Sequence, residues 1–272
     1  MTLSVLAPTS AAATVPAAEG DGPHIPGPND FWLPLFGPDG FEITEQMVWG
    51  GVAVAIICTV MVVMSNRAKV VPSYGQWLFE GFYNIPRNSI ARDMIGTKEF
   101  KKFVPLLASL FSLILLTNLF GVLPPVMNPV SGAIGFPIAF TAVVYVVYHW
   151  IGFSRHGFIG YFKHMVPAGV PLWISPVILL LELVTYFIFR PLTLALRLFG
   201  NMFAGHMLIL LLAGAAGYFL LEGDGIMRLM SVPTYLMAGA MFVFEMLIQF
   251  LQAFVFTLLA ASYIAGALAD DH

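Results

Sequence analysis

Charged side chains are scarce in this sequence. Lys, Arg, Asp and Glu together make up 10% of its 272 residues, whereas soluble domains carry about 25%. Between Lys102 and Arg155 none of these four residue types occurs. A helix that crosses the roughly 30 Å hydrocarbon core of a bilayer needs about 20 mostly apolar residues. With a mean hydropathy of +0.86, the chain is predicted to be an integral membrane protein.

Cysteine and enzyme motifs are almost or entirely missing. Cys58 is the single cysteine and lies in the first apolar run, which excludes a disulfide framework and a cysteine metal site. The sequence contains no G-x-x-x-x-G-K-[ST] nucleotide loop, no His-Glu-x-x-His and no Gly-x-Ser-x-Gly. We therefore expect a protein without catalysis of its own, and without cofactor, metal or nucleic-acid partner.

Basic residues are confined to particular parts of the chain. Residues 1–66 contain no Lys or Arg, whereas residues 67–102 hold seven of the twelve. Under the positive-inside rule this basic segment is cytoplasmic. We therefore expect an extracytoplasmic N-terminus, a cytoplasmic C-terminus and a multi-pass protein of the bacterial plasma membrane. Within 71–102, aromatic and charged residues alternate, which indicates an amphipathic helix at the cytoplasmic interface.

The charge-poor blocks predict an all-α membrane fold. Residues 1–44, rich in Pro, Gly and Ala, are expected to form a flexible extracytoplasmic tail, and residues 45–272 a single transmembrane helical domain. Tyr145, Tyr148 and Trp150 are expected to form an aromatic flank at the membrane surface. The last two blocks are overlong and joined by a short polar turn, so they predict long, tilted, antiparallel neighbours. The five expected spans are about 46–65, 103–123, 137–153, 172–220 and 233–267.

Polar residues inside the last two blocks form two helical stripes. Ionisable groups at this depth are costly and usually functional. At about 100° per residue, Arg190, Thr193, Arg197 and Asn201 share one face of the fourth block. An arginine does not release its proton in a protein, so Arg197 cannot relay protons; it can block a proton path or attract a carboxylate. The second stripe, on the fifth block, consists of Glu245, Gln249 and Gln252.

Antiparallel packing predicts which of these residues meet. With Gln252 level with Arg197, a rise of about 1.5 Å per residue places His206 and Glu245 at similar depth on the outer side. A histidine beside a carboxylate suits proton relay. Glu182 lies toward the cytoplasm, subject to a kink at Pro176 or Pro191.

Each of these residues also has a simpler interpretation. His206 alone would more often be a satisfied core histidine, and Gln249 can serve in helix packing. Arg190 can extend its charge to the interface, and Glu182 can be its structural partner. Arg197 has no acid at i±3 or i±4, so its partner must come from elsewhere, including another protein.

The polar stripes lie within longer motifs of a known family. The strings RPLTLALRLFGNMFAGH (190–206), LQAFVF (251–256) and TNLFGVLP (117–124) strongly resemble subunit a of the F-type ATP synthase, in order, within a similarity over about residues 45–267. The resemblance implies a stator that carries protons through two offset half-channels to and from the carboxyl groups of a c-subunit ring. It implies that Arg197 separates the half-channels. Peripheral-stalk b subunits, which residues 71–102 would face, and indirectly the catalytic sector would be further partners.

The resemblance also implies roles for the other polar residues. Asn201, His206, Glu245 and Gln252 match positions of the external half-channel, while Glu182, Arg190 and Thr193 would line the cytoplasmic exit. Some members of the family carry an acid at the His206 position and a histidine at the Glu245 position. Here the two are exchanged, which preserves one acid and one imidazole.

Two other classes of protein were weighed against this hypothesis. An independent secondary transporter would use Arg197 and Glu245 for substrate coupling, but the chain shows no internal repeat of 20–50 residues. An intramembrane hydrolase or metalloenzyme would need motifs that the sequence lacks. Activity of the purified chain alone would favour the transporter, whereas a stator would be inert without its ring.

Overall fold

The protein folds as a bundle of long helices. The computed structural model describes residues 34–36, 43–123, 129–165 and 174–269. Within them, five helical segments are long and apolar enough to cross a membrane. The expected all-helical fold and its five spans are thus confirmed; the bounds differ from the expected ones by up to three residues, except that the third span ends later and the fifth begins earlier than expected. They are α1 (Glu45–Asn66), α4 (Phe100–Val122), α5 (Gly135–His164), α6 (Ser175–Val184) continuing into α7 (Arg190–Leu221), and α8 (Ile226–Leu268).

Shorter elements connect these spans. Two short strands, β1 (Pro34–Phe36) and β2 (Ile43–Thr44), pair antiparallel just before α1. The other residues of the expected tail, 1–33 and 37–42, lie outside the described residues, so the proposed division at residue 44 stays a prediction. The remaining short helices are α2 (Tyr74–Asn84), η2 (Ile85–Arg92), α3 (Asp93–Ile95), η3 (Val130–Gly132) and η4 (Thr185–Phe189).

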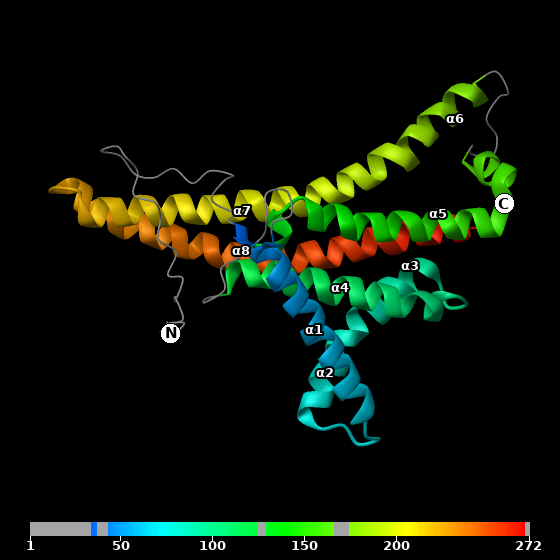
Figure 1. Ribbon diagram of the computed structural model, residues 1–272, viewed down its shortest axis with the longest axis horizontal. Coiled ribbons are helices and arrows are strands. Elements are labelled where there is room, and N and C mark those ends of the chain that lie inside the picture. Colours follow the sequence, from blue (N-terminus) through cyan, green and yellow to red (C-terminus); the bar gives the residue numbers. More distant parts are fainter. Residues whose placement is uncertain (1–33, 37–42, 124–128, 166–173, 270–272) are drawn as a thin grey trace, which may run out of the picture.

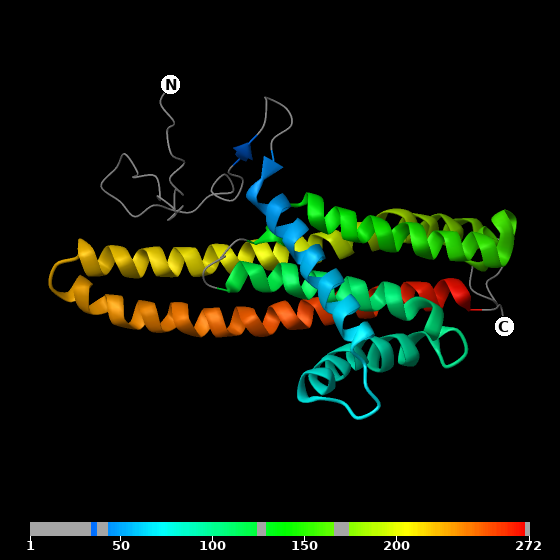
Figure 2. The same ribbon diagram turned by 60° about the horizontal axis from the view of Figure 1, so that its bottom comes forward.

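Helices α4, α5, α7 and α8 pack together, and α1 crosses them obliquely (Figures 1 and 2). The apolar core includes Phe111 of α4, Tyr148 of α5, Leu198 of α7 and Phe256 of α8, each almost completely buried. Helices α7 and α8 run antiparallel and side by side, joined at a turn where Gly225 has a φ of 56°. The prediction that the last two helices are antiparallel neighbours is confirmed. Their hairpin extends beyond the ends of the other described helices.

The segment between α1 and α4 is not one helix. Ser73 caps the N-terminus of α2: its hydroxyl accepts a hydrogen bond from the backbone N–H of Gln76. A π-helical segment that contains Pro86 follows α2. Trp77 of α2 is exposed, as an interfacial helix requires. Glu99, just before α4, forms a 2.8 Å ion pair with Arg155 of α5. This pair places the basic segment and the distal part of α5 at the same end of the bundle.

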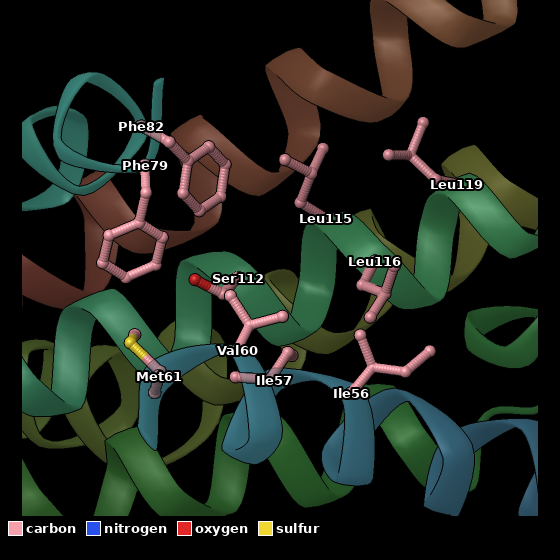
Figure 3. Close-up of a pocket in the computed structure, with 10 residues that line it drawn as sticks. All are labelled: Ile56, Ile57, Val60, Met61, Phe79, Phe82, Ser112, Leu115, Leu116 and Leu119. Carbon is pink, nitrogen blue, oxygen red and sulfur yellow. The ribbon is translucent and has the colours of Figure 1, made fainter. Parts of the chain in front are cut away.

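Helix α1 packs against the bundle near its N-terminal end and is more exposed toward its C-terminal end. Near its start, Trp49 packs edge-on against Phe120 with ring centroids 5.5 Å apart, and Ala53 is fully buried. Toward its end, α1, α2 and α4 enclose a cavity of about 240 Å³ (Figure 3). Its lining is aliphatic and aromatic apart from the hydroxyl of Ser112. None of the side chains that line it is titratable.

The fourth span bends where α6 meets α7. The backbone N–H of Arg190 bonds to the carbonyl of Thr185, five residues earlier, within the π-helical turn η4. Pro191 has no N–H and its ring would clash with the carbonyl four residues earlier in a regular helix, which favours such a widened turn. Figure 1 shows α6 diverging from the axis of α7. Of the two kinks considered, the one at Pro191 is present.

Helices α4 and α7 approach closely at Gly121. A Cβ atom built on Gly121 collides with the terminal methyl of Met202, which is fully buried. We expect Gly121→Val to lower the free energy of unfolding by about 1–3 kcal/mol, the usual cost of overpacking. Thermal denaturation of the detergent-solubilised complex measures it. Gly51→Val is the matched control, because nothing lies within 4 Å of a Cβ there; equal melting temperatures for the two variants would contradict the α4–α7 contact.

Candidate functional site

The polar stripe of α8 faces the interior of the bundle. Glu245, Gln249 and Gln252 are spaced four and three residues apart and are 2%, 0% and 7% exposed. The Nε2 of Gln249 donates to Oε1 of Glu245 at 3.2 Å. The opposite side of α8 carries exposed apolar residues such as Leu247 and Leu251. Burying three polar side chains on one face of a membrane helix is costly unless they form hydrogen bonds with one another or with a transported species.

The pairing of α7 with α8 follows the register expected from the sequence. A Cβ atom on Gly205 would meet Oε1 of Glu245 at 2.9 Å, and Gln249 donates to the sulfur of Met202 at 2.9 Å. His206, next to Gly205, is buried. The prediction that His206 and Glu245 lie at similar depth is therefore confirmed. The absence of a side chain on Gly205 is what lets the Glu245 carboxyl lie against α7.

Several polar atoms of this region are buried without a hydrogen-bond partner among the described residues. They are Oε2 of Glu245, Oε1 of Gln249, Nε2 of Gln252 and Nδ2 of Asn201. Each such atom costs about 1–3 kcal/mol when nothing replaces its lost hydration. Other described residues also carry unpartnered buried atoms, but these four lie along α7 and α8, where they leave hydrogen-bonding positions open to water or another polar species. Within the part of the chain that the structure describes, no group of three metal-binding side chains occurs.

Arg197 lies on the other side of α7. Its side chain is exposed, and it makes no hydrogen bond or ion pair with the residues that the structure describes. Leu192 and Leu196 of the same helix are exposed as well. An unpaired cation in the middle of a membrane span is costly, so Arg197 needs a partner that the described residues do not supply. This agrees with the expectation that its partner comes from elsewhere, including another protein.

The residues expected at the inner end of the path are not brought together. The guanidinium carbon of Arg190 lies 3.4 Å from the ring centroid of Tyr186 and 5.0 Å from that of Tyr263. The structural pair with Glu182 is not observed among the described residues, because the guanidinium packs against these rings; the extension of Arg190 to the interface stays a prediction. The Thr193 hydroxyl donates to the carbonyl of Phe189 at 2.6 Å, so this donor is used within its own helix.

An aromatic cluster lies around Arg190 and was not predicted from the sequence. Tyr148 was expected in the interfacial flank but is only 2% exposed, whereas Trp150 is 73% exposed as expected. The Tyr148 hydroxyl donates to the carbonyl of Tyr186 at 2.8 Å. His149 is buried against Phe187, with ring centroids 4.5 Å apart. The signal was present in the spacing of Tyr145, Tyr148 and His149, which puts all three on one helical face.

Comparison with known proteins decides the family. The profile of the ATP synthase A chain family matches residues 47–265. The chain belongs to this family. It is 42% identical to the ATP synthase subunit a of a Nocardioides species over 97% of this chain and 100% of that protein. It is 37% identical to the ATP synthase subunit a of Pseudarthrobacter chlorophenolicus over 96% and 99% of the two chains.

Family membership shows the general role of the subunit. Members of the ATP synthase A chain family are multi-pass subunits of the Fo sector, and this chain is its proton-conducting stator subunit, without a catalytic centre of its own. The buried Glu245 stripe and the exposed Arg197 therefore lie in a subunit that conducts protons.

Proposed function

We propose that the chain conducts protons through two offset half-channels, which Arg197 keeps apart. The observation that carries this proposal is the opposite placement of two charged groups on the α7–α8 pair. Glu245 is buried between the helices, while Arg197 is exposed on the outer face of α7. A continuous path past both would have to cross a fixed cation, which cannot relay a proton.

The outer half-channel runs along the buried stripe. Glu245 and His206 take up and release protons, because a carboxylate and an imidazole both titrate within reach of physiological pH. Gln249, Gln252 and Asn201 continue the stripe toward the level of Arg197. Their unpartnered polar atoms, the acceptor Oε1 of Gln249 and the donors Nε2 of Gln252 and Nδ2 of Asn201, supply hydrogen bonds to water molecules that carry the proton along the way. The stripe therefore supports proton entry at Glu245 and delivery near Gln252.

The partner of Arg197 is a carboxyl group on a ring of c subunits. Arg197 stabilises the ionised form of this carboxyl group and so favours transfer of its proton to water in the adjoining half-channel before the ring turns further. The apolar residues around Arg197, including exposed Leu192 and Leu196, suit a dry, sliding contact with other membrane helices. Rotation of the ring then becomes the only route by which a proton passes from one half-channel to the other.

Protons leave by the half-channel that Glu182, Arg190 and Thr193 shape. The end of the bundle with Lys102 and the Glu99–Arg155 pair faces the cytoplasm, as the positive-inside rule favours. The N-terminus and the turn between α7 and α8 are then extracytoplasmic, and the C-terminus is cytoplasmic. Segment α2–α3 lies at the cytoplasmic surface, where it meets the b subunits of the peripheral stalk.

The two hypotheses differ in whether the chain conducts protons without the ring of c subunits: an independent transporter would, whereas a stator would not. Inverted vesicles that hold the complete membrane sector, stripped of the catalytic sector, are expected to dissipate an imposed pH gradient. Vesicles from cells that make equal amounts of this chain but no c subunit are expected to hold the gradient. An immunoblot for the chain controls its abundance. Equal dissipation of the pH gradient in both preparations would contradict the stator mechanism and favour the transporter.

A further inference from the structure

The π-helical turn before α7 leaves one backbone carbonyl without its usual partner. In a regular helix the carbonyl of Tyr186 would accept from the N–H of Arg190, but that N–H bonds to Thr185 instead. A π-type bond would come from residue 191, which is a proline and has no N–H. An unpaired carbonyl inside a membrane is costly. The hydroxyl of Tyr148 donates to it at 2.8 Å, so a side chain of α5 replaces the missing bond.

This hydrogen bond helps to position Tyr186, whose ring packs against the Arg190 guanidinium. The ring of Tyr186 lies beneath the Arg190 guanidinium at 3.4 Å, and Tyr263 of α8 lies 5.0 Å from it. Tyr148 and Tyr263 also pack against each other, with ring centroids 5.8 Å apart. Three helical elements, α5, η4 and α8, therefore contribute one tyrosine each around a single cation.

We propose that Tyr148, Tyr186 and Tyr263 are positioning residues that hold Arg190 away from the face where Arg197 is exposed. This inference rests on the proposed function, in which a ring carboxylate meets Arg197. Arg190 precedes Arg197 by seven residues, about 10 Å along a helix and nearly on the same face. A mobile guanidinium there would offer the carboxylate a second binding position on the exit side. The cage leaves Arg197 as the one arginine that the carboxylate meets.

The three tyrosines make different contributions to this cage. Tyr186 supplies the ring face that attracts the cation, an interaction that is strongest when water is excluded. Tyr148 supplies the hydroxyl that keeps the π-helical turn in place, and its own ring is 2% exposed. Tyr263 closes the side toward α8. Removing the ring of Tyr186 is therefore expected to release Arg190, whereas removing only its hydroxyl is not.

A double-mutant cycle in the complete synthase tests the cage. ATP-driven acidification of inverted vesicles is measured for Tyr186→Leu, Arg190→Gln and the double variant, with assembly checked in the same membranes. We expect Tyr186→Leu to lower the initial rate about fivefold, the factor by which one such contact shifts an equilibrium. The double variant is expected to pump at the rate of Arg190→Gln alone, because without the guanidinium the ring has nothing to hold.

Conservative variants separate positioning from simple packing. Tyr186→Phe keeps the ring and is expected to pump within about twofold of the parent. Tyr148→Phe keeps its ring but loses the hydrogen bond, and is expected to slow pumping only while Arg190 is present. Losses that multiply in the double variant, or an unaffected Tyr186→Leu, would overturn the cage. Either result leaves the effect of Arg197→Ala untouched, so failure of the cage is distinguishable from failure of the half-channel mechanism.

Discussion

Replacing Arg197 with alanine is expected to abolish ATP-driven acidification of inverted vesicles while the complex remains assembled. The exposed guanidinium has no partner among the described residues, so its loss breaks no contact within them. It does leave the ring carboxylate without a cation, which costs about 3–5 kcal/mol for a buried charge. We therefore expect the pumping rate to fall at least about a hundredfold. Acridine-dye quenching measures the rate, and native electrophoresis of the same membranes measures assembly.

The same substitution is expected to raise passive proton leak. A charge that crosses the membrane gains about 2.3 kcal/mol per 100 mV, and this energy is conserved only while Arg197 separates the two half-channels. Leu196→Ala is the matched control, since Leu196 directly precedes Arg197 in α7 and is also exposed; it is expected to pump and leak like the parent. Near-parental pumping by Arg197→Ala would refute the assignment of Arg197 as barrier and ring partner.

Replacing Glu245 with glutamine is expected to lower pumping about a hundredfold, the usual contribution of one positioned proton-transfer group. Glutamine preserves the shape of the side chain against Gly205 and its hydrogen bond with Gln249 but carries no exchangeable acidic proton. The loss thus reports proton transfer rather than packing. The measurement is the initial rate of ATP-driven acidification in vesicles with equal amounts of assembled complex.

Exchanging the two titratable residues tests whether they act as a pair. The double variant His206→Glu, Glu245→His keeps one acid and one imidazole at the same depth of the α7–α8 interface. We expect it to recover at least about a tenth of the parental rate, well above either single change. Leu247→Ala, two residues from Glu245 and exposed, is the control for general damage to α8. A double variant no faster than Glu245→Gln would contradict a shared relay.

The sequence predicted the site better than it predicted the fourth span. Spacing along α8 placed Glu245, Gln249 and Gln252 on one face, and antiparallel packing placed His206 at the level of Glu245, because both follow from the fixed geometry of a helix. The bend between α6 and α7 was foreseen only as one of two alternatives. Its form depends on how the chain compensates a missing N–H, which involves Tyr148, 38 residues away from Tyr186.

The position of Arg190 could not be predicted for a similar reason. Local spacing offered Glu182 as a partner or the interface as a destination, since both are visible within one helix. The tyrosines that surround the guanidinium come from α5, η4 and α8. Interfacial aromatics and buried aromatics share the same residue types, so Tyr148 was assigned to the membrane surface. Only tertiary packing distinguishes the two environments.

The hairpin of α7 and α8 extends past the ends of the other described helices (Figures 1 and 2). The hairpin is therefore held by the other helices at one end, near Arg197, and is free at the other end, at the turn with Gly225. Small residues along the pair, such as Ala216 and Ala238, are buried and let the two helices pack closely together. A sideways load on the outer face then deflects the tip first, while the level of Arg197 keeps its alignment.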